Sequence, residues 1–334
     1  VTQGTGGAGA DTHLVANVMT RCFMRPCSDD ARNAALNSAV LTQHEHHAAI
    51  AASLQRVPGH AVWQTPAPVG LTDGEQRAFE RRREHARVLV MRLSAEMADA
   101  AVEGRNMGIM QQLQQADAGL PQLFLPAAAS DDSLQALNAV QDRTRFYTCV
   151  CGEAYVVGNC GQLNGAGRCA SCGRNVGAGT NNAGTFNQQN VTHDRPGYHP
   201  LPLQMLVRTA GNTRSLSARS AAVTDMLVHA WLLAGLCQGA GDAVHQLVVP
   251  RLPLSDRDGD REDVVGSALL RRLVSVFEQV EVNYGADTMA VSGVVHDVVS
   301  RCLQQHTLFT RGLNNAAGRA GLEQELHEIV EASA

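Results

Sequence analysis

One stretch of the chain limits its possible folds more than any other, because it concentrates the cysteines. Five of the nine cysteines fall between residues 149 and 172. Cys169 and Cys172 form a Cys-x-x-Cys pair, and further thiols begin 20 residues upstream at Cys149. Two sets of thiols on glycine-rich turns, separated in this way, are the arrangement that closes a tetrahedral zinc site. The stretch therefore predicts a small zinc-binding finger.

The finger holds one more thiol than a zinc ion can use, since structural zinc takes four ligands. Cys169 and Cys172 are expected ligands in any arrangement, and Cys149 is the natural third. The fourth ligand could be Cys151, Cys160 or the carboxylate of Glu153. Spacing alone leaves these alternatives open, and the cysteine that is not used becomes a free thiol beside the metal.

The residues around these cysteines resemble the RZ-type zinc finger. The shared pattern is aromatic-Tyr-x-Cys at 146–149, Tyr-Val-x-Gly-x-Cys-Gly at 155–161, Cys-x-x-Cys at 169–172 and a final hydrophobic-Gly-x-Gly at 176–179. This finger occurs in the mysterin family of AAA-type ubiquitin ligases and in a family of helicase-like zinc-finger proteins. The resemblance extends over residues 143–306, specific in the finger and loose in the leucine-rich segment that follows it.

The resemblance implies roles for the individual cysteines. In the family, the position of Cys160 is the nucleophile that accepts ubiquitin as a thioester, and position 153 is a histidine ligand. This chain has Glu153 there, and it has Cys151 where the family has no cysteine. The resemblance therefore implies that Cys160 is free and catalytic. One Zn²⁺ would be held by Cys149, Cys151, Cys169 and Cys172.

A second departure concerns the groups that would assist the nucleophile. The family often has a histidine just after the final glycine pair, where this chain has Asn181. A base or cation for Cys160 would then come from elsewhere, and the nearby choices are His193, His199, Arg168 and Arg174. For each of the two histidines, an ordinary surface position is the simpler interpretation.

Two functions from different classes follow from the resemblance. The first is an enzyme, the part of a ubiquitin ligase that takes ubiquitin from a conjugating enzyme and passes it to an amine or hydroxyl of a target. The alternative is a non-catalytic module, of a helicase-like or AAA-type immunity protein, that binds protein or RNA. The implied partners are a ubiquitin-conjugating enzyme, ubiquitin and the remainder of a larger polypeptide, since the chain begins at Val1. The cysteines outside the finger are scattered, as in the reducing cytoplasm, where we expect the protein.

Composition narrows the class of protein. A net charge of -5 and 4% aromatic residues argue against a general nucleic-acid-binding surface, which needs a basic groove and stacking platforms. No stretch approaches 18 consecutive apolar residues, so no membrane span is expected. Hydrophobic residues make up 44% of the chain and few are aromatic, so the core should consist of Ala, Leu and Val on helices.

The periodicity of the apolar residues also indicates helices, so we expect an all-α fold: a helical scaffold with one small inserted zinc-binding finger. We expect an N-terminal helical region at 1–140, the finger at 141–184 and a C-terminal helical region at 185–334. Asp73 should cap the longest helix, and His229 should be a packed, hydrogen-bonded histidine. The predicted helices span 11–24, 29–57, 73–104, 107–115, a short segment from 130, 215–236, 261–283, 286–305 and 316–332.

Overall fold

The computed structural model describes the helical parts of the chain and the short strands of the finger. The predicted helices at 11–24, at 107–115 and from 130 lie outside the described residues, as does the first part of the helix predicted at 29–57. The described residues are 47–102, 123, 125–127, 145–149, 154–157, 166–168, 175–177, 183–185, 197–200, 203, 206, 216–249, 252, 261–304 and 316–333.

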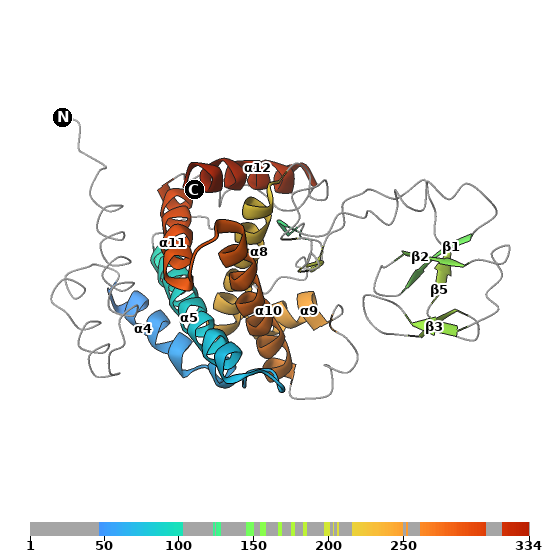
Figure 1. Cartoon of the computed structure of the whole chain (residues 1–334), viewed down its shortest axis with the longest axis horizontal. Helices are drawn as coiled ribbons and strands as arrows, with labels where there is room; N and C mark the ends of the chain where they lie inside the picture. Colours follow the sequence, from blue (N-terminus) through green and yellow to red (C-terminus); the bar gives the residue numbers. More distant parts are fainter. Residues whose placement is uncertain are drawn as a thin grey trace.

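This part of the chain is mostly helical, as the sequence predicts, and the longer strands belong to the finger (Figure 1). The helices are α4 (His47–Gly59), the 3₁₀ turn η1 (Ala61–Gln64), α5 (Asp73–Val102), α8 (Ala218–Cys237), α9 (Gly241–Val248), α10 (Arg261–Tyr284), α11 (Thr288–Gln304) and α12 (Ala316–Ala332). The strands are β1 (Arg145–Cys149), β2 (Ala154–Val157), β3 (Ala166–Arg168), β4 (Asn175–Gly177) and β5 (Ala183–Thr185). Five of the predicted helices are confirmed as α5, α8, α10, α11 and α12, whereas α9 was not predicted as a separate helix.

The start of α5 differs from the sequence prediction, because Thr72 caps this helix and Asp73 does not. The Thr72 hydroxyl accepts the backbone N–H of Glu75 at 3.4 Å, and the Glu75 carboxylate accepts the backbone N–H of Thr72 at 2.8 Å. This reciprocal pairing is a capping box, which needs Ser or Thr at the cap and Glu three residues later. Thr72 and Glu75 have that spacing, so Asp73 becomes the first residue of the helix.

Helix α8 forms the centre of the bundle. Every residue of α8 except Arg219 is buried. It packs against α10, α5 and α12, which surround it in Figure 1. A helix that is apolar on all sides is stable in water only when other helices cover it, so the surrounding helices are arranged by the need to bury α8.

Both ends of α8 are closed by local hydrogen bonds. Ser217 accepts the backbone N–H of Ser220 at 3.1 Å at the first turn. At the last turn Gly239 has φ +95°, and the N–H groups of Gly239 and Ala240 donate to the carbonyls of Leu236 and Gly235. This pair of bonds is a Schellman motif, which needs the left-handed conformation that glycine adopts without strain.

Helix α8 is also long and apolar enough, by length and composition, to cross a membrane. All of its most apolar window is buried by the rest of the chain, and the core helix of a globular fold meets the same criteria. The remaining described helices do not meet them.

Two glycines within helices offer a matched test of this packing. A Cβ at exposed Gly293 on α11 would have no atom within 4 Å, so we expect Gly293→Ala to stabilise the protein by about 0.5–1 kcal/mol through helix propensity. A Cβ at Gly266 on α10 would lie 3.0 Å from Val62 Cγ2 and 3.1 Å from Leu236 Cδ2, so Gly266→Ala should gain less. Urea unfolding of both variants measures the difference, and an equal or larger gain at Gly266 would contradict the packing described here.

Candidate functional site

The finger is built from two antiparallel units. Strand β1 is the middle strand of a three-stranded sheet with the order β2-β1-β5, and its Thr148 lies opposite Ala154 of β2. Strands β3 and β4 form a second, two-stranded sheet in which Arg168 lies opposite Asn175. In Figure 1 the strands form a group of their own beside the helices. The strands were not predicted from the sequence.

The connections of these two hairpins carry the cysteines. Cys149 is the last residue of β1, and residues 150–153, which include Cys151, join β1 to β2. Residues 169–174 join β3 to β4 and contain the Cys-x-x-Cys pair. Each hairpin therefore carries two cysteines in its connection or at the strand end beside it, and four thiolates are a donor set that a structural zinc ion prefers. The chain therefore fits the metal that the sequence predicts.

The predicted ligand side chains lie outside the described part of the structure. The side chain of Cys149 is outside the described part of the structure, and the four other cysteines of the finger and Glu153 lie outside the described residues altogether. Cys160 belongs to residues 158–165, between β2 and β3. The assignment of four thiols to zinc and of Cys160 to catalysis thus stays a prediction.

The groups that were considered as assistants to Cys160 are only partly described. Arg168 is exposed at the end of β3, directly before Cys169. His199 is half-buried in the segment that follows the finger. Residues His193, Arg174 and Asn181 lie outside the described residues.

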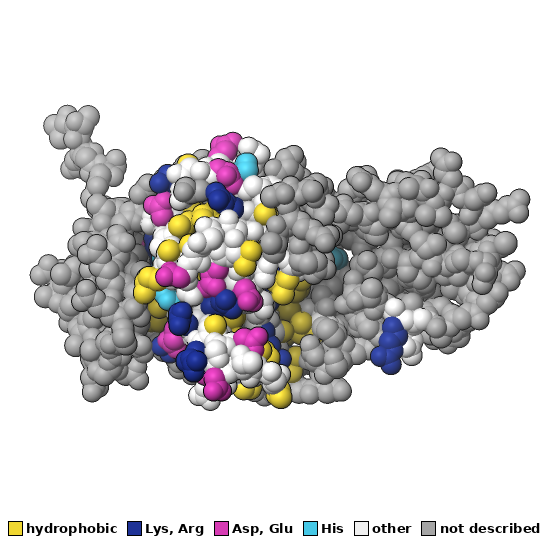
Figure 2. Space-filling view, viewed as in Figure 1, with side chains coloured by type: hydrophobic (Ala, Val, Ile, Leu, Met, Phe, Trp, Pro, Cys, Tyr) yellow, Lys and Arg dark blue, Asp and Glu magenta, His cyan; other side chains and the backbone are white. Residues whose placement is uncertain are grey.

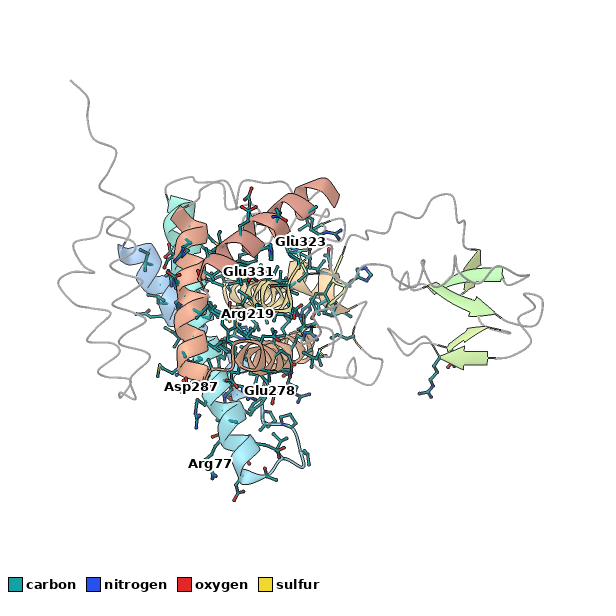
Figure 3. The ribbon with its side chains drawn as sticks, turned by 45° about the horizontal axis from the view of Figure 1, so that its top comes forward. Arg77, Arg219, Glu278, Asp287, Glu323 and Glu331 are labelled. Carbon is teal, nitrogen blue, oxygen red and sulfur yellow. The ribbon has the colours of Figure 1, made fainter. Side chains whose placement is uncertain are left out.

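The chain segments on either side of the finger meet on the helical bundle, and we call residues 123, 125–127 and 197–198 the neck. The Gly197 N–H donates to the Leu123 carbonyl at 2.6 Å. The Ala127 N–H donates to Glu323 Oε1 of α12 at 2.9 Å, and Glu323, labelled in Figure 3, is buried. Ala127 has φ +52°, a left-handed conformation that is uncommon for a residue with a side chain and that its surroundings must hold.

A buried chain of polar contacts joins the neck to the central helix. The Tyr198 hydroxyl lies 2.7 Å from His229 Nε2, and His229 Nδ1 lies 2.7 Å from the Asp225 carbonyl oxygen. Since a carbonyl can only accept, Nδ1 carries the ring hydrogen and Nε2 accepts from the Tyr198 hydroxyl. The Asp225 carboxylate in turn accepts hydrogen bonds from Nε and Nη2 of Arg272, at 3.1 and 2.8 Å. The prediction of a packed, hydrogen-bonded His229 is confirmed, but no sequence pattern marked Tyr198 as its partner.

Burial determines the protonation states in this chain of contacts. Loss of hydration lowers the pKa of His229, although the Asp225 carboxylate opposes that effect. Loss of hydration also raises the pKa of Tyr198. Both groups are therefore neutral at pH 7, which is the state that the observed hydrogen bonds require.

A second buried polar cluster joins α5 to α11. Arg92 Nη1 lies 2.7 Å from the His296 carbonyl oxygen and 3.1 Å from His296 Nδ1, and its Nη2 donates to Ser300 Oγ at 2.7 Å. Burial, with the nearby Arg92 and His85, lowers the pKa of His296 to about 3. His296 is thus neutral, and its Nδ1 can accept from the guanidinium. The cluster holds two helices together.

A third cluster contains the residue types of a hydrolase triad but not its geometry. Ser220 Oγ lies 2.8 Å from His327 Nδ1, and Glu331 Oε1 lies 4.0 Å from the same nitrogen. In a Ser-His-acid triad the nucleophile and the acid contact opposite ring nitrogens. Ser220 is also fully buried at the first turn of α8. These groups, with Glu331 and Arg219 labelled in Figure 3, close the start of α8.

The described helical bundle offers no alternative metal site. No group of three or more His, Cys, Asp or Glu side chains that could hold a metal occurs among the described residues. In Figure 2 the basic side chains on the visible face of the bundle are interspersed with acidic ones. The cysteine-bearing hairpins therefore remain the candidate site.

Comparison with known proteins agrees with the class of site that the hairpins define, a zinc finger. The model of the RZ type zinc finger domain matches residues 136–189, so the chain contains an RZ-type finger and, with it, a zinc-binding site. This match covers the five strands and all five clustered cysteines. No curated protein and no solved structure matches the chain.

The hydrogen bond between Tyr198 and His229 can be tested by removing the Tyr198 hydroxyl, with Tyr284 as a matched control. Tyr198→Phe leaves the buried Nε2 of His229 without a donor, so we expect a loss of about 1–3 kcal/mol in the free energy of unfolding. The Tyr284 hydroxyl has no hydrogen-bond partner among the described residues, so Tyr284→Phe should change stability by less than about 0.5 kcal/mol. Denaturant unfolding tests both, and equal effects would show that the contact between Tyr198 and His229 adds nothing.

The low pKa of His296 predicts a stability that falls in acid. The folded-state pKa of about 3 lies below the usual 6.5, so the unfolded chain binds a proton that the folded chain does not. The stability that comes from keeping His296 neutral is fully present above pH 6.5 and is lost as the pH falls toward 3. Between pH 7 and pH 5 it should remove about 2 kcal/mol.

The variant His296→Asn keeps an acceptor for Arg92 but does not titrate. Its free energy of unfolding should therefore depend less on pH, by about the same 2 kcal/mol over that interval. Urea titrations at the two pH values make the comparison, and an unchanged pH dependence would exclude a neutral, buried His296.

Proposed function

We propose that the finger is the ubiquitin-accepting part of a ubiquitin ligase, in which Cys160 carries ubiquitin as a thioester. The observation that carries this proposal is the fifth cysteine in a finger whose metal needs four ligands. The match to the RZ type zinc finger domain supports the presence of the finger. The link to ubiquitin transfer comes from the resemblance of its cysteine pattern to the finger of mysterin-type ubiquitin ligases.

In this proposal one Zn²⁺ is bound by the two pairs of thiols at the hairpin connections, Cys149 with Cys151 and Cys169 with Cys172. The position of each pair beside the end of a hairpin supports this assignment, because a metal can then join the two hairpins. Cys160 belongs to neither connection, since it lies between β2 and β3. When bound, zinc supplies the stability that so small a finger lacks, on the order of 10–16 kcal/mol in comparable peptides.

The proposed chemistry is two successive acyl transfers. The Cys160 thiolate attacks the carbonyl carbon of the thioester between the conjugating enzyme and ubiquitin. A new C–S bond forms, and the thiolate of the conjugating enzyme leaves. A target amine or hydroxyl then attacks the same carbon, the bond to Cys160 breaks, and the proton of the attacking group passes to a base.

Zinc with four thiolates carries a net charge of about -2, so it does not activate Cys160. Exposed Arg168 is the described cation nearest in sequence to the finger cysteines.

Two cysteines outside the finger provide an internal comparison. Cys237 of α8 and Cys302 of α11 are buried in the bundle. Burial raises the pKa of each thiol to about 12, so neither forms an appreciable amount of thiolate at neutral pH. Neither can compete with an accessible cysteine for ubiquitin.

The test is to trap the adduct. The full chain is incubated with activating enzyme, conjugating enzyme, ATP and ubiquitin, and we expect an adduct that thiol reagents cleave. Cys160→Ser should convert it to an oxyester that resists thiols and is cleaved by hydroxide, because oxygen replaces sulfur in the acyl bond. Cys302→Ser is the matched control and should leave the thioester unchanged.

Zinc analysis of the same variants separates the two roles of cysteine. Cys160→Ala should keep about one zinc per chain and lose the adduct, if four other thiols hold the metal. If it loses zinc, Cys160 is a ligand and the catalytic assignment is wrong. If zinc is kept and no adduct forms on the wild-type chain, the finger is a non-catalytic binding module.

A further inference from the structure

The basic residues of this chain are all of one kind. Arginine supplies all 27 of them and lysine supplies none in 334 residues. Lysine is among the commonest residues of ordinary proteins. Suppose that lysine made up only about one in five of the basic residues. A chain with 27 basic residues would then lack lysine by chance on the order of twice in a thousand cases. The substitution of arginine for lysine therefore needs a reason.

At some positions the structure itself requires a guanidinium. Arg272 donates two N–H groups to Asp225 Oδ2, and Arg82 donates two to Glu281 Oε2 at 3.0 and 2.7 Å. Arg92 reaches His296 and Ser300 with two different nitrogens. A lysine has one nitrogen and cannot make these forked contacts.

At other positions nothing in the described structure requires arginine. Arg77 and Arg81 on α5 and Arg271 on α10 are exposed, and none of them has a hydrogen bond or ion pair with another described residue. Arg77 lies near the first turn of α5, at the end of the bundle in Figure 3. Lysine and arginine have nearly equal helix propensity, so a lysine would serve as well at all three positions. The described contacts therefore give no structural reason for arginine at these three positions.

The chemistry of the amine explains what is avoided. A neutral lysine amine attacks a thioester carbonyl carbon, forms a C–N bond, releases the thiolate and gives its proton to water or a base. The lysine pKa near 10.4 makes the neutral form accessible, whereas the guanidinium stays cationic and has no free electron pair to donate. Arginine therefore keeps the surface charge without offering an acceptor for ubiquitin.

We propose that this chain lacks lysine so that it cannot become the target of ubiquitin transfer, either from its own Cys160 or from other ligases nearby. The inference concerns self-modification, and its first part rests on the function proposed above. Hydroxyl groups and the terminal amine remain as acceptors, but esters are distinguished from isopeptides because hydroxylamine cleaves only the esters.

The test adds amines where the structure tolerates them. One full-length variant carries Arg77→Lys, Arg81→Lys and Arg271→Lys, and its matched control carries Arg→Gln at the same positions, which removes the charge without adding an amine. Both should keep the helical circular dichroism of the wild type. With activating enzyme, conjugating enzyme and ubiquitin, the lysine variant should gain at least about tenfold more hydroxylamine-resistant adduct than the wild type or the control, because three lysine amines are added to the single terminal amine that all three chains share. Peptide mapping should place it at positions 77, 81 or 271.

A second arm separates this inference from the proposed function. The same three chains are exposed to a separate ligase of broad acceptor range, so that the result does not depend on Cys160. Modification of the lysine variant alone supports the inference even if no thioester forms at Cys160. If the wild type forms the thioester and the lysine variant gains no isopeptide in either arm, the absence of lysine offers no protection. The inference also fails if the separate ligase modifies wild type and lysine variant equally.

Discussion

The helical part of this protein depends on the burial of one apolar helix. Helix α8 has no polar face to turn to solvent, so α5, α10 and α12 must cover it. Two of the buried polar side chains on α8 have specific partners: Asp225 pairs with Arg272, and His229 with Tyr198. Such contacts cost little when complete and much when one partner is lost, so they fix the arrangement of helices more than they add to its stability.

The same contacts join the two parts of the chain. The finger lies between the two segments of the neck, which are fixed by Glu323 from α12 and by His229 from α8. Two different forces therefore act on the two parts, apolar burial in the bundle and metal ligation in the finger. The neck gives the finger a fixed point of attachment to a bundle that forms a core of its own.

Much of this organisation could be predicted from the sequence. The helices at α5, α8, α10, α11 and α12 follow from apolar periodicity, and the finger follows from its cysteine spacing. The contacts of the neck could not be predicted, because Glu323 and Ala127 are 196 positions apart and nothing local marks them as partners. The cap of α5 was assigned to the wrong neighbour, since Asp73 and Thr72 are both good caps and only the reciprocal bonds with Glu75 distinguish them. The choice among five thiols is of the same kind, because ligation depends on positions in space and not on spacing alone.

If the finger has one thiol more than its zinc can bind, X-ray absorption at the zinc edge should distinguish Cys160 from the ligands. We expect four sulfur neighbours at about 2.3 Å in the wild-type protein and an identical spectrum in the Cys160→Ala variant. We also expect Cys151→Ala to replace one sulfur with a lighter atom. Loss of a sulfur neighbour in Cys160→Ala, with no change in Cys151→Ala, would contradict this assignment.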